Sequence, residues 1–560
     1  MEEQMQTLCT LDWLVLTIYA LSMLYVGWHF SRRSHTMENY MLGGRRMKSW
    51  TVGLSLFATM LSAISYMAWP GEMIKHGPVV FCGLIAYPVF SLVIGWLIIP
   101  SIMKQNVGSA YELLEKRLGV SVRVLASLFF LALRIIWMSV IIYMVAYKVI
   151  LPLMGWPTKY GLVTCVVLGL VTVIYTSLGG LRAVVVTDVA QTFILLGGAI
   201  LSMILITKNL GGVAAWWPDK WADNWEKFQF WPTVGSSPGT SRTILGAFIA
   251  TFSWYICTAG SDQMAIQRYL STRNAKSARQ AFLISICTDI FVTVFLGVMG
   301  LALLAFYQAH PEKLPPLNPT DSILKTQTIE NNTPVLIADV ISSDNETDLI
   351  DERIKHNADK LFPRFIIVGL PAGISGLVLA GLLAAAMSSL SSGINSSCLV
   401  ITEDFIGRFR KEQTTSLQKV KLAKFISLAI GGTVVLLSCV VGYISGNILE
   451  VAHKTVNLLV APLFVPFFMA LFVRKAKSWA TCVGMVASVL AAVCIAYWLE
   501  IRMLLSEILN WEMIANINGL GFLWIMPVSF VVGVLVSWIL SILNINRVNV
   551  SAETQNTSPS

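Results

Sequence analysis

The sequence predicts an all-α integral membrane protein, and three observations support that fold class. Of its 560 residues, 56% are hydrophobic and 13% are charged, whereas soluble domains carry about 25% charged residues. Apolar runs of about 20 residues recur along the chain, each long enough to cross a hydrocarbon core about 30 Å thick. The runs are continuous rather than alternating, and a spanning segment must satisfy its own backbone hydrogen bonds, so we expect helices rather than a barrel.

We expect about thirteen transmembrane helices. They lie at residues 11–31, 50–74, 79–103, 122–151, 157–179, 183–206, 243–262, 280–307, 362–397, 420–443, 448–473, 476–500 and 519–543. With the N-terminus outside, every strongly basic loop falls on the cytoplasmic side, as the positive-inside bias requires. The C-terminus is then cytoplasmic, and we expect a multi-pass protein of the plasma (inner) membrane.

The first apolar run is expected to be a retained helix and not a cleaved signal. Leu11–Phe30 follows acidic Glu2 and Glu3, whereas a signal peptide has a positively charged start.

The polar segments suggest one transmembrane domain over 1–546, with an external insertion at 309–361. The last residues, 547–560, read as a disordered cytoplasmic tail because they are mostly polar. Asn331 and Asn345 stand in N-x-Thr sequons, which matter only in a eukaryotic secretory-pathway protein.

Charge and motif content argue against several classes of protein. The net charge of +9 comes from Lys and Arg that concentrate in short loops, where they set orientation, so we expect no nucleic-acid partner. The nine cysteines form no CxxC pair, which makes a zinc site or a disulfide framework improbable. The chain has no HExxH motif and only six histidines, so we expect no enzyme and no catalytic residue. The expected partners are the lipid bilayer and small solutes, with no obligatory protein partner evident.

A polar stripe interrupts one of the most apolar segments, in "AAAMSSLSSGINSS" at residues 384–397. On a helix Ala385, Ser388, Ser392 and Asn395 fall along one face, with Ser391 beside them. Such a stripe has three uses: hydroxyls bond to carbonyls one turn earlier, small side chains let another helix approach, or oxygens bind a ligand. The sequence alone leaves all three open.

Ligand binding by hydroxyl and carbonyl oxygens suits a hard monovalent cation. Transporters often complete such sites with carbonyls freed by a broken helix. The second span offers a break, because "SLFATMLSAISYMAWPG" mixes small and polar residues into an apolar run and ends on Pro70-Gly71. We therefore expect Na⁺ between this break and the serine face.

Three ordered motifs resemble those of the sodium:solute symporter family, which includes sodium/glucose, sodium/proline and sodium/sialic acid cotransporters. They are "YTSLGGLRAVVVTDVAQTF" at Tyr175–Phe193, "DQMAIQRYLSTRNAKSARQA" and "LLAAAMSSLSSGINS". The resemblance covers essentially all spans. It implies a leucine-transporter-type fold, with two inverted five-helix repeats after an extra N-terminal helix and binding sites near the midplane.

The resemblance also implies sodium ligands. The family's common sodium site falls on five residues: Ala58, Leu61, Ala385, Ser388 and Ser389. A second site, known in bacterial sialic acid symporters, falls on four: Asp188, Ser388, Ser391 and Ser392. One or two coupling Na⁺ ions are thus expected. The alternative for Asp188 is an interfacial carboxylate that faces cytoplasmic water or pairs with Arg182.

The solute is less closely specified. Sugar-transporting members have polar residues at positions that correspond here to Leu84 and Tyr255, and these departures weaken a glucose or galactose reading. Ser62 and Ser65 match substrate-facing positions of sialic acid symporters, but Met60 stands where those members have threonine.

Arg134 lies near the middle of the fourth span, where an arginine costs about 2.5–3.5 kcal/mol on insertion scales. Its planar guanidinium suits a carboxylate, and sialic acid symporters have an arginine in the same span that meets the substrate carboxylate. The alternative is an internal ion pair with Asp289.

These residues predict a sodium-coupled secondary active symporter that imports a small organic solute by alternating access, with a carboxylated sugar or organic acid such as sialic acid favoured. The alternatives are a sodium/monosaccharide cotransporter and an uncoupled sensor or channel on the same fold.

Overall fold

The structure is a computed structural model that describes residues 8–32, 36–105, 107–218, 221, 225–231, 243–315, 346–407, 415–441, 448–509, 520 and 522–543. The predicted tail at 547–560 and both sequons, at Asn331 and Asn345, lie outside these residues. Within the described residues, all regular structure is helical.

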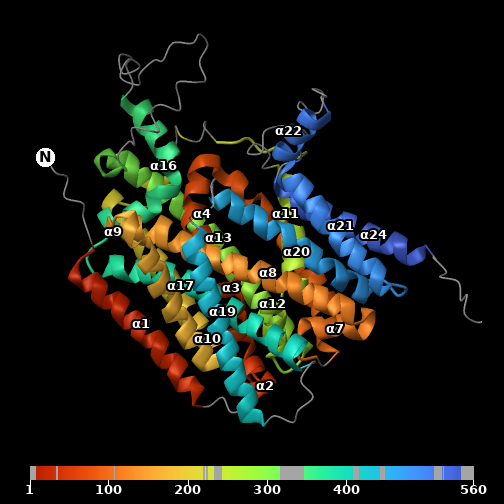
Figure 1. Ribbon diagram of the computed structural model, residues 1–560. Coiled ribbons are helices and arrows are strands. Elements are labelled where there is room, and N and C mark those ends of the chain that lie inside the picture. The colour runs from red at the N-terminus through yellow and green to blue at the C-terminus, as the bar shows by residue number, and fades with distance from the viewer. Residues whose placement is uncertain are drawn as a thin grey trace, which may run out of the picture.

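The helices cross one another as a single bundle (Figure 1). The longer ones are α1 (Thr10–Ser31), α3 (Ser49–Met60), α4 (Ala63–His76), α8 (Val120–Met144), α10 (Gly161–Leu210), α11 (Ile244–Ser261), α13 (Ala275–Ala309), α16 (Glu346–Val368), α17 (Ile374–Val400), α19 (Ser416–Val441), α20 (Ile448–Phe472), α21 (Ser478–Ala496), α22 (Trp498–Leu509) and α24 (Ile525–Ile542). Shorter helices are α2 (Met37–Leu42), α5 (Tyr87–Leu92), α6 (Ile99–Met103), α7 (Ala110–Leu118), α9 (Leu151–Met154) and α12 (Gln263–Leu270).

The all-helical membrane fold is confirmed. In the described residues, ten helices are long and apolar enough to cross a membrane. The other three predicted spans are the broken pair α3 and α4, one half of α10, and α20, whose described apolar part is Asn457–Phe472.

Helix α10 holds two predicted spans because the chain is helical on both sides of Gly180, which has φ of 63° and ψ of −164°. A side chain is strained in that backbone conformation, and a Cβ there would lie 2.5 Å from the carbonyl oxygen of Tyr40.

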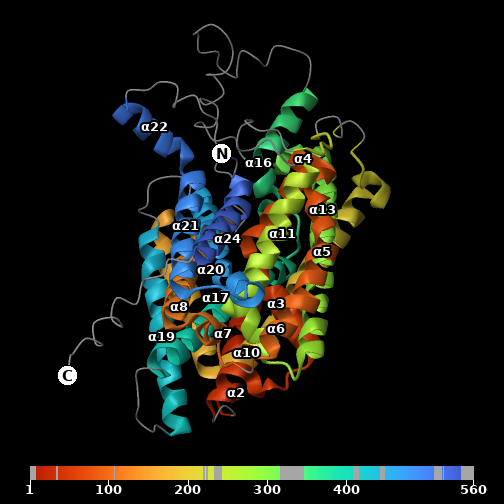
Figure 2. The ribbon, with the colours of Figure 1, turned by 90° about the vertical axis from the view of Figure 1, so that its right-hand side faces the viewer.

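The predicted ninth span, 362–397, is wrong in its bounds, because the chain is broken between α16 and α17 at residues 369–373. Its first part belongs to α16, which packs against α4 and buries Ile354, Ala358 and Leu361. Part of the predicted insertion at 309–361 is therefore ordered helix. Figure 2 places α16 beside α4 on the side of the bundle opposite α19.

Helix α17 lies in the centre, in contact with α1, α3, α8, α10 and α19. Its N-terminus is held by Asp12 of α1, whose Oδ1 accepts hydrogen bonds from the amides of Gly373 (2.7 Å) and Gly376 (2.8 Å). A carboxylate at a helix N-terminus is favourable because it meets free N–H groups and the positive end of the helix dipole.

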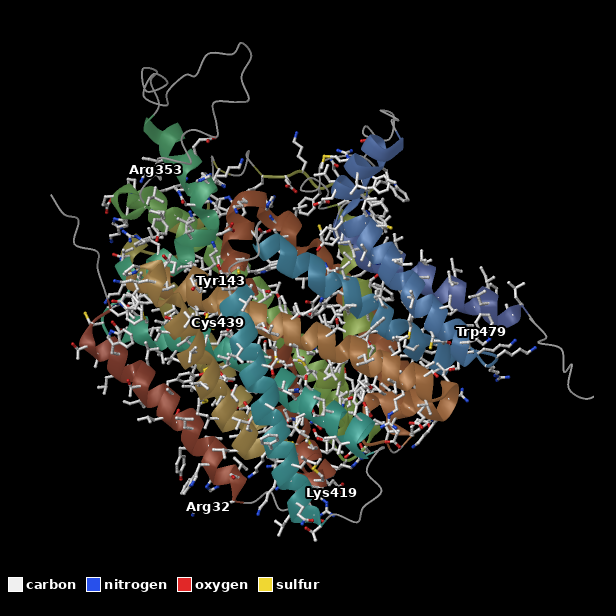
Figure 3. All side chains as sticks on the ribbon, viewed as in Figure 1. Arg32, Tyr143, Arg353, Lys419, Cys439 and Trp479 are labelled. Carbon is white, nitrogen blue, oxygen red and sulfur yellow. The ribbon has the colours of Figure 1, made fainter. Side chains whose placement is uncertain are left out.

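Charged side chains gather toward the two ends of the bundle. Arg32 and Lys419 lie at one end, and Arg353 lies at the opposite end (Figure 3). The residues before the loop that follows the first predicted span and after the loop that follows the ninth therefore lie on the same side, as the charge pattern predicts.

Candidate functional site

Two helices are broken inside the bundle, and each is the first helix of a predicted five-helix set. Helix α3 ends at Met60 and α4 begins at Ala63, with Leu61 extended (φ −74°, ψ 125°). Helix α11 ends at Ser261 and α12 begins at Gln263, with Asp262 equally extended (φ −74°, ψ 124°). The first break was predicted, whereas the second was not. Its signal was Asp262 itself, since aspartate favours the position just before a helix.

The serines of α17 meet the first break. Ser388 Oγ donates to the carbonyl oxygens of Ala58 (2.7 Å) and Ala385 (3.1 Å). Ser389 Oγ lies 3.3 Å from the carbonyl oxygen of Leu61 and 3.3 Å from that of Thr59. The five residues predicted for the first sodium site are thus brought together, with two hydroxyls and three carbonyls converging from α3, its broken end and α17.

Other serines of the stripe serve the helix itself. Ser391 Oγ donates to the carbonyl oxygen of Ser388 (3.0 Å), and Ser396 Oγ donates to that of Ser392 (2.5 Å). All of residues 384–397 are buried, so none of the hydroxyls faces lipid. The stripe therefore contains both hydroxyls that bond to carbonyls of their own helix and hydroxyls that are placed like the ligands of an ion.

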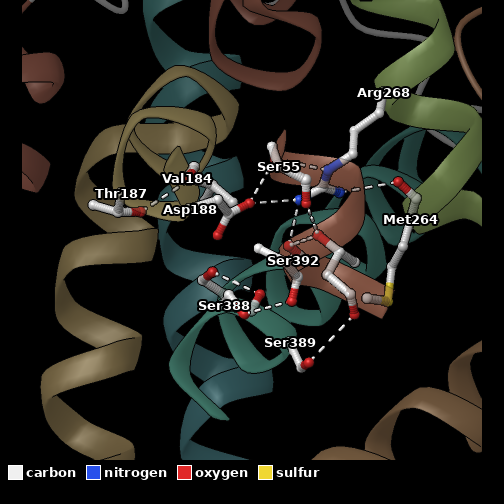
Figure 4. A network of polar contacts seen from close by, with 12 residues as sticks. Ser55, Val184, Thr187, Asp188, Met264, Arg268, Ser388, Ser389 and Ser392 are labelled. Atoms are coloured by element: carbon white, nitrogen blue, oxygen red, sulfur yellow. Dashed lines mark hydrogen bonds and ion pairs between the residues drawn. The ribbon is translucent and has the colours of Figure 1, made fainter. Parts of the chain in front are cut away.

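A second polar cluster lies about one helix turn away along α3 and α17, around Asp188 of α10 (Figure 4). Asp188 Oδ2 accepts from Ser55 Oγ (2.5 Å) and from Arg268 Nη2 (3.0 Å). Ser392 Oγ accepts from the same Arg268 nitrogen (2.5 Å) and lies 2.9 Å from Thr59 Oγ1. Asp188 and Arg268 are both 0% exposed, so this ion pair is fully removed from water.

The alternatives given for Asp188 are wrong. It is not interfacial, and Arg182 instead donates from Nε to the carbonyl oxygen of Gly43 (3.0 Å). Sequence reasoning missed Arg268 as its partner, although the residue stands in the quoted "QRYL" motif. The signal that could have identified Arg268 is a basic residue in a segment whose apolar pattern places it inside the bundle, because a buried charge needs a partner.

Arg134 of α8 forms an ion pair with Asp262, at the second helix break. Asp262 Oδ1 also accepts from the amide of Met264 (2.9 Å), which caps α12. Nε of Arg134 is buried and has no hydrogen-bond partner among the described residues.

The expected alternative pair between Arg134 and Asp289 is wrong. Asp289 Oδ2 instead accepts hydrogen bonds from the hydroxyls of Tyr87 (2.6 Å) and Tyr255. The two tyrosine oxygens lie 2.9 Å apart.

A cavity of about 570 Å³ opens beside the first break, between α4, α5, α11 and α13. This volume suits a small organic solute, since ligand pockets commonly measure about 300–1,000 Å³. Among the predicted solute-contacting residues, Ser65 lines it, and so do Leu84 and Tyr255 at the positions where sugar transporters have polar residues. Ser62 and Arg134 are not among its described lining residues.

The first cluster and the cavity share Leu61. Its carbonyl oxygen faces Ser389, and the same residue lines the cavity. The oxygens of this cluster carry no net charge, which suits a hard monovalent cation better than a zinc-type metal. In the second cluster, Asp188 Oδ1 is buried without a hydrogen-bond partner, so one carboxylate oxygen there remains available to a cation.

Comparisons with known proteins match this chain over most of its length. The model of the sodium:solute symporter family matches residues 40–488. A sodium/sialic acid symporter of Proteus mirabilis is 28% identical over 87% of this chain and 90% of its own length. A sodium/sialic acid symporter of Aliivibrio fischeri is 28% identical over 86% of this chain and 87% of its own length. Among solved structures, a substrate-bound, outward-open Na⁺-coupled sialic acid symporter superposes with a TM-score of 0.76 at 26% identity, covering 95% of this chain and 98% of that one.

Proposed function

This chain belongs to the sodium:solute symporter family and is a sodium-coupled symporter, and we propose that it imports a carboxylated sugar or organic acid such as sialic acid. It does so by alternating access, as one transporter domain and without enzymatic chemistry. We also propose that it lies in the plasma (inner) membrane, with its N-terminus outside and its C-terminus in the cytoplasm.

The first coupling sodium binds among the carbonyls of Ala58, Leu61 and Ala385 and the hydroxyls of Ser388 and Ser389. The convergence of these oxygens at a helix break is the observation that carries the proposal. When sodium binds, the two hydroxyl protons turn away from the carbonyls, so that five lone pairs face the ion. Because Leu61 also lines the cavity, ion binding at the break and solute binding in the cavity act on the same backbone.

A second sodium position is formed by Asp188, Ser388, Ser391 and Ser392. Arg268 holds two of its oxygens, Asp188 Oδ2 and Ser392 Oγ, so the ion requires the guanidinium to withdraw from them. A sodium ion in that place would compensate the buried carboxylate as Arg268 does.

The number of sodium ions decides whether voltage drives uptake. One sodium with a monovalent anion moves no net charge, whereas two move one positive charge. At a potential of about 100 mV that charge contributes ~2.3 kcal/mol, which is more than a tenfold gain in accumulation.

The solute carboxylate is proposed to meet Arg134. Its unpartnered Nε leaves a hydrogen-bond donor for a carboxylate oxygen even while Asp262 holds another nitrogen. The similarity to two sialic acid symporters supports this reading, and sialic acid is therefore the first compound to test.

The experiment is uptake of radiolabelled sialic acid into proteoliposomes, with and without an inward sodium gradient, beside radiolabelled galactose. We expect sodium-dependent accumulation of sialic acid above equilibrium, and loss of that accumulation in Arg134→Ala. Accumulation of galactose alone would refute the carboxylate proposal and assign Arg134 to the pair with Asp262. Equilibration without accumulation would indicate a channel or a sensor.

A further inference from the structure

Asp289 is an ionisable side chain within a membrane-spanning helix that the sodium sites do not use. It lies near the middle of α13, is half-buried, and lines the cavity. A charged residue at the centre of a spanning helix is costly, and such residues usually mark the path of a substrate or an ion.

The structure gives Asp289 hydrogen-bond donors but no counter-ion. Its partners among the described residues are the hydroxyls of Tyr87 and Tyr255, which both donate to Oδ2. Since both hydroxyls donate, the carboxyl group acts as an acceptor, as the ionised form does. Among the described residues, no Lys, Arg or His forms an ion pair with Asp289 and no donor reaches its Oδ1.

The described lining of the cavity includes the carboxylate of Asp289, but neither lysine nor arginine. His76, at its edge, already bonds to Glu226 through Nδ1 (2.6 Å). An anionic group is therefore unfavourable beside Asp289, whereas a cationic group would supply the missing countercharge.

Aromatic rings form the walls around this carboxylate. Tyr255 stacks on Phe90 with 4.2 Å between ring centroids, and Trp254 stands edge-on to it at 4.8 Å. The indole of Trp69, also on the cavity wall, is fixed by a hydrogen bond to the carbonyl oxygen of Thr293 (2.8 Å). Aromatic faces attract organic cations, and the attraction grows when the cation is desolvated.

We propose that Asp289, held by Tyr87 and Tyr255, binds a protonated amine of the transported solute. The inference rests on the proposed function and deepens it: the solute is a zwitterion whose carboxylate lies away from Asp289 and whose ammonium group lies against it. Sialic acid, whose amine is acetylated, satisfies only the carboxylate half of this recognition. Compounds with both groups therefore bind more tightly than their amine-free counterparts.

The test measures binding to the purified full-length protein in sodium buffer by isothermal titration calorimetry, with probe pairs that differ in the amine. The pairs are β-alanine with propionate, and γ-aminobutyrate with butyrate. We expect the amine-bearing member of each pair to bind at least tenfold more tightly. Asp289→Asn should bring that ratio close to one, while Asp289→Glu retains it. The matched control, Asp359→Asn, removes a surface carboxylate paired with Lys75 (2.5 Å) and should keep the preference.

The wild-type comparison decides the proposal even if a variant at position 289 does not fold. Equal binding within both pairs, or no binding by any amine-bearing probe, overturns it. A preference for the amine-bearing probes that persists in folded Asp289→Asn also overturns the proposal. Stabilisation of the solute-free protein by sodium is measured in parallel. If sodium stabilises the protein but no amine preference is found, only the Asp289 site is refuted. If sodium does not stabilise the protein, the proposed sodium coupling is refuted.

Discussion

Replacing Arg268 by methionine tests whether sodium reaches Asp188. Arg268 makes four contacts in the buried cluster: with Asp188 Oδ2, Ser392 Oγ, Ser55 Oγ (2.9 Å) and the carbonyl oxygen of Met264 (3.0 Å). Methionine keeps much of the side-chain volume but removes the charge, so the substitution leaves a carboxylate that is 0% exposed without its cation.

The expected loss can be worked out for two buffers. Breaking a buried ion pair by removing one partner costs about 3–5 kcal/mol, and this full cost should appear in potassium buffer. In sodium buffer, an ion bound beside Asp188 at about 100 times its dissociation constant would recover ~2.7 kcal/mol. The Arg268→Met protein should therefore depend on sodium for its stability more strongly than the wild type.

The assay is thermal unfolding of the detergent-purified protein in matched sodium and potassium buffers. The first sodium site is present in both proteins. A change in the stability difference between sodium and potassium buffers therefore reports on the second position alone. Arg182→Met, which removes a guanidinium outside the cluster, is the matched control and should show the wild-type difference. An equal loss of stability for Arg268→Met in both buffers would refute the reasoning, since Asp188 would then be inaccessible to sodium.

Two further predictions concern the backbone and the solute. Gly180→Ala places a Cβ in a left-handed conformation and 2.5 Å from the carbonyl oxygen of Tyr40, so we expect a loss of at least about 1–2 kcal/mol, seen as a lower midpoint of thermal unfolding. An unchanged midpoint would contradict the need for glycine at this turn. Asp262→Asn removes the negative charge beside Arg134 and should tighten binding of sialic acid about tenfold, or ~1.4 kcal/mol, measured by calorimetry. Unchanged or weaker binding would indicate that the solute carboxylate does not meet Arg134.

Much of the fold could be predicted because membrane-spanning helices are recognisable from their composition and length. The first helix break was also predictable, since small and polar residues around Ser62 interrupt an apolar run before Pro70. The two spans on either side of Gly180 were separated correctly although helical structure flanks that residue directly. The bounds around α16 and α17 were wrong because the apolar run was taken as continuous, although Gly369, Pro371 and Gly373 are helix-breaking residues at the interruption.

The candidate sodium ligands could be placed by resemblance, but their partners could not. Asp188 and Arg268 are 80 residues apart, and sequence spacing does not determine which helices carry them together. A pair between Arg134 and Asp289 was the alternative expected, because opposite charges in a membrane tend to pair. In the structure Asp289 instead accepts hydrogen bonds from Tyr87 and Tyr255, and Arg134 pairs with Asp262 at a helix break.

Equilibrium binding of ²²Na⁺ to the solute-free, purified protein tests the central claim most directly, because it needs no knowledge of the solute. Ser388→Ala and Ser389→Ala each remove one hydroxyl that faces the α3 break, and each should weaken sodium binding about tenfold, or ~1.4 kcal/mol. Ser396→Ala, which removes a hydroxyl bonded only to its own helix, should bind sodium like the wild type. Wild-type affinity in both Ser388→Ala and Ser389→Ala would contradict the account, because the serine face would then be helix packing and the coupling ion would bind elsewhere.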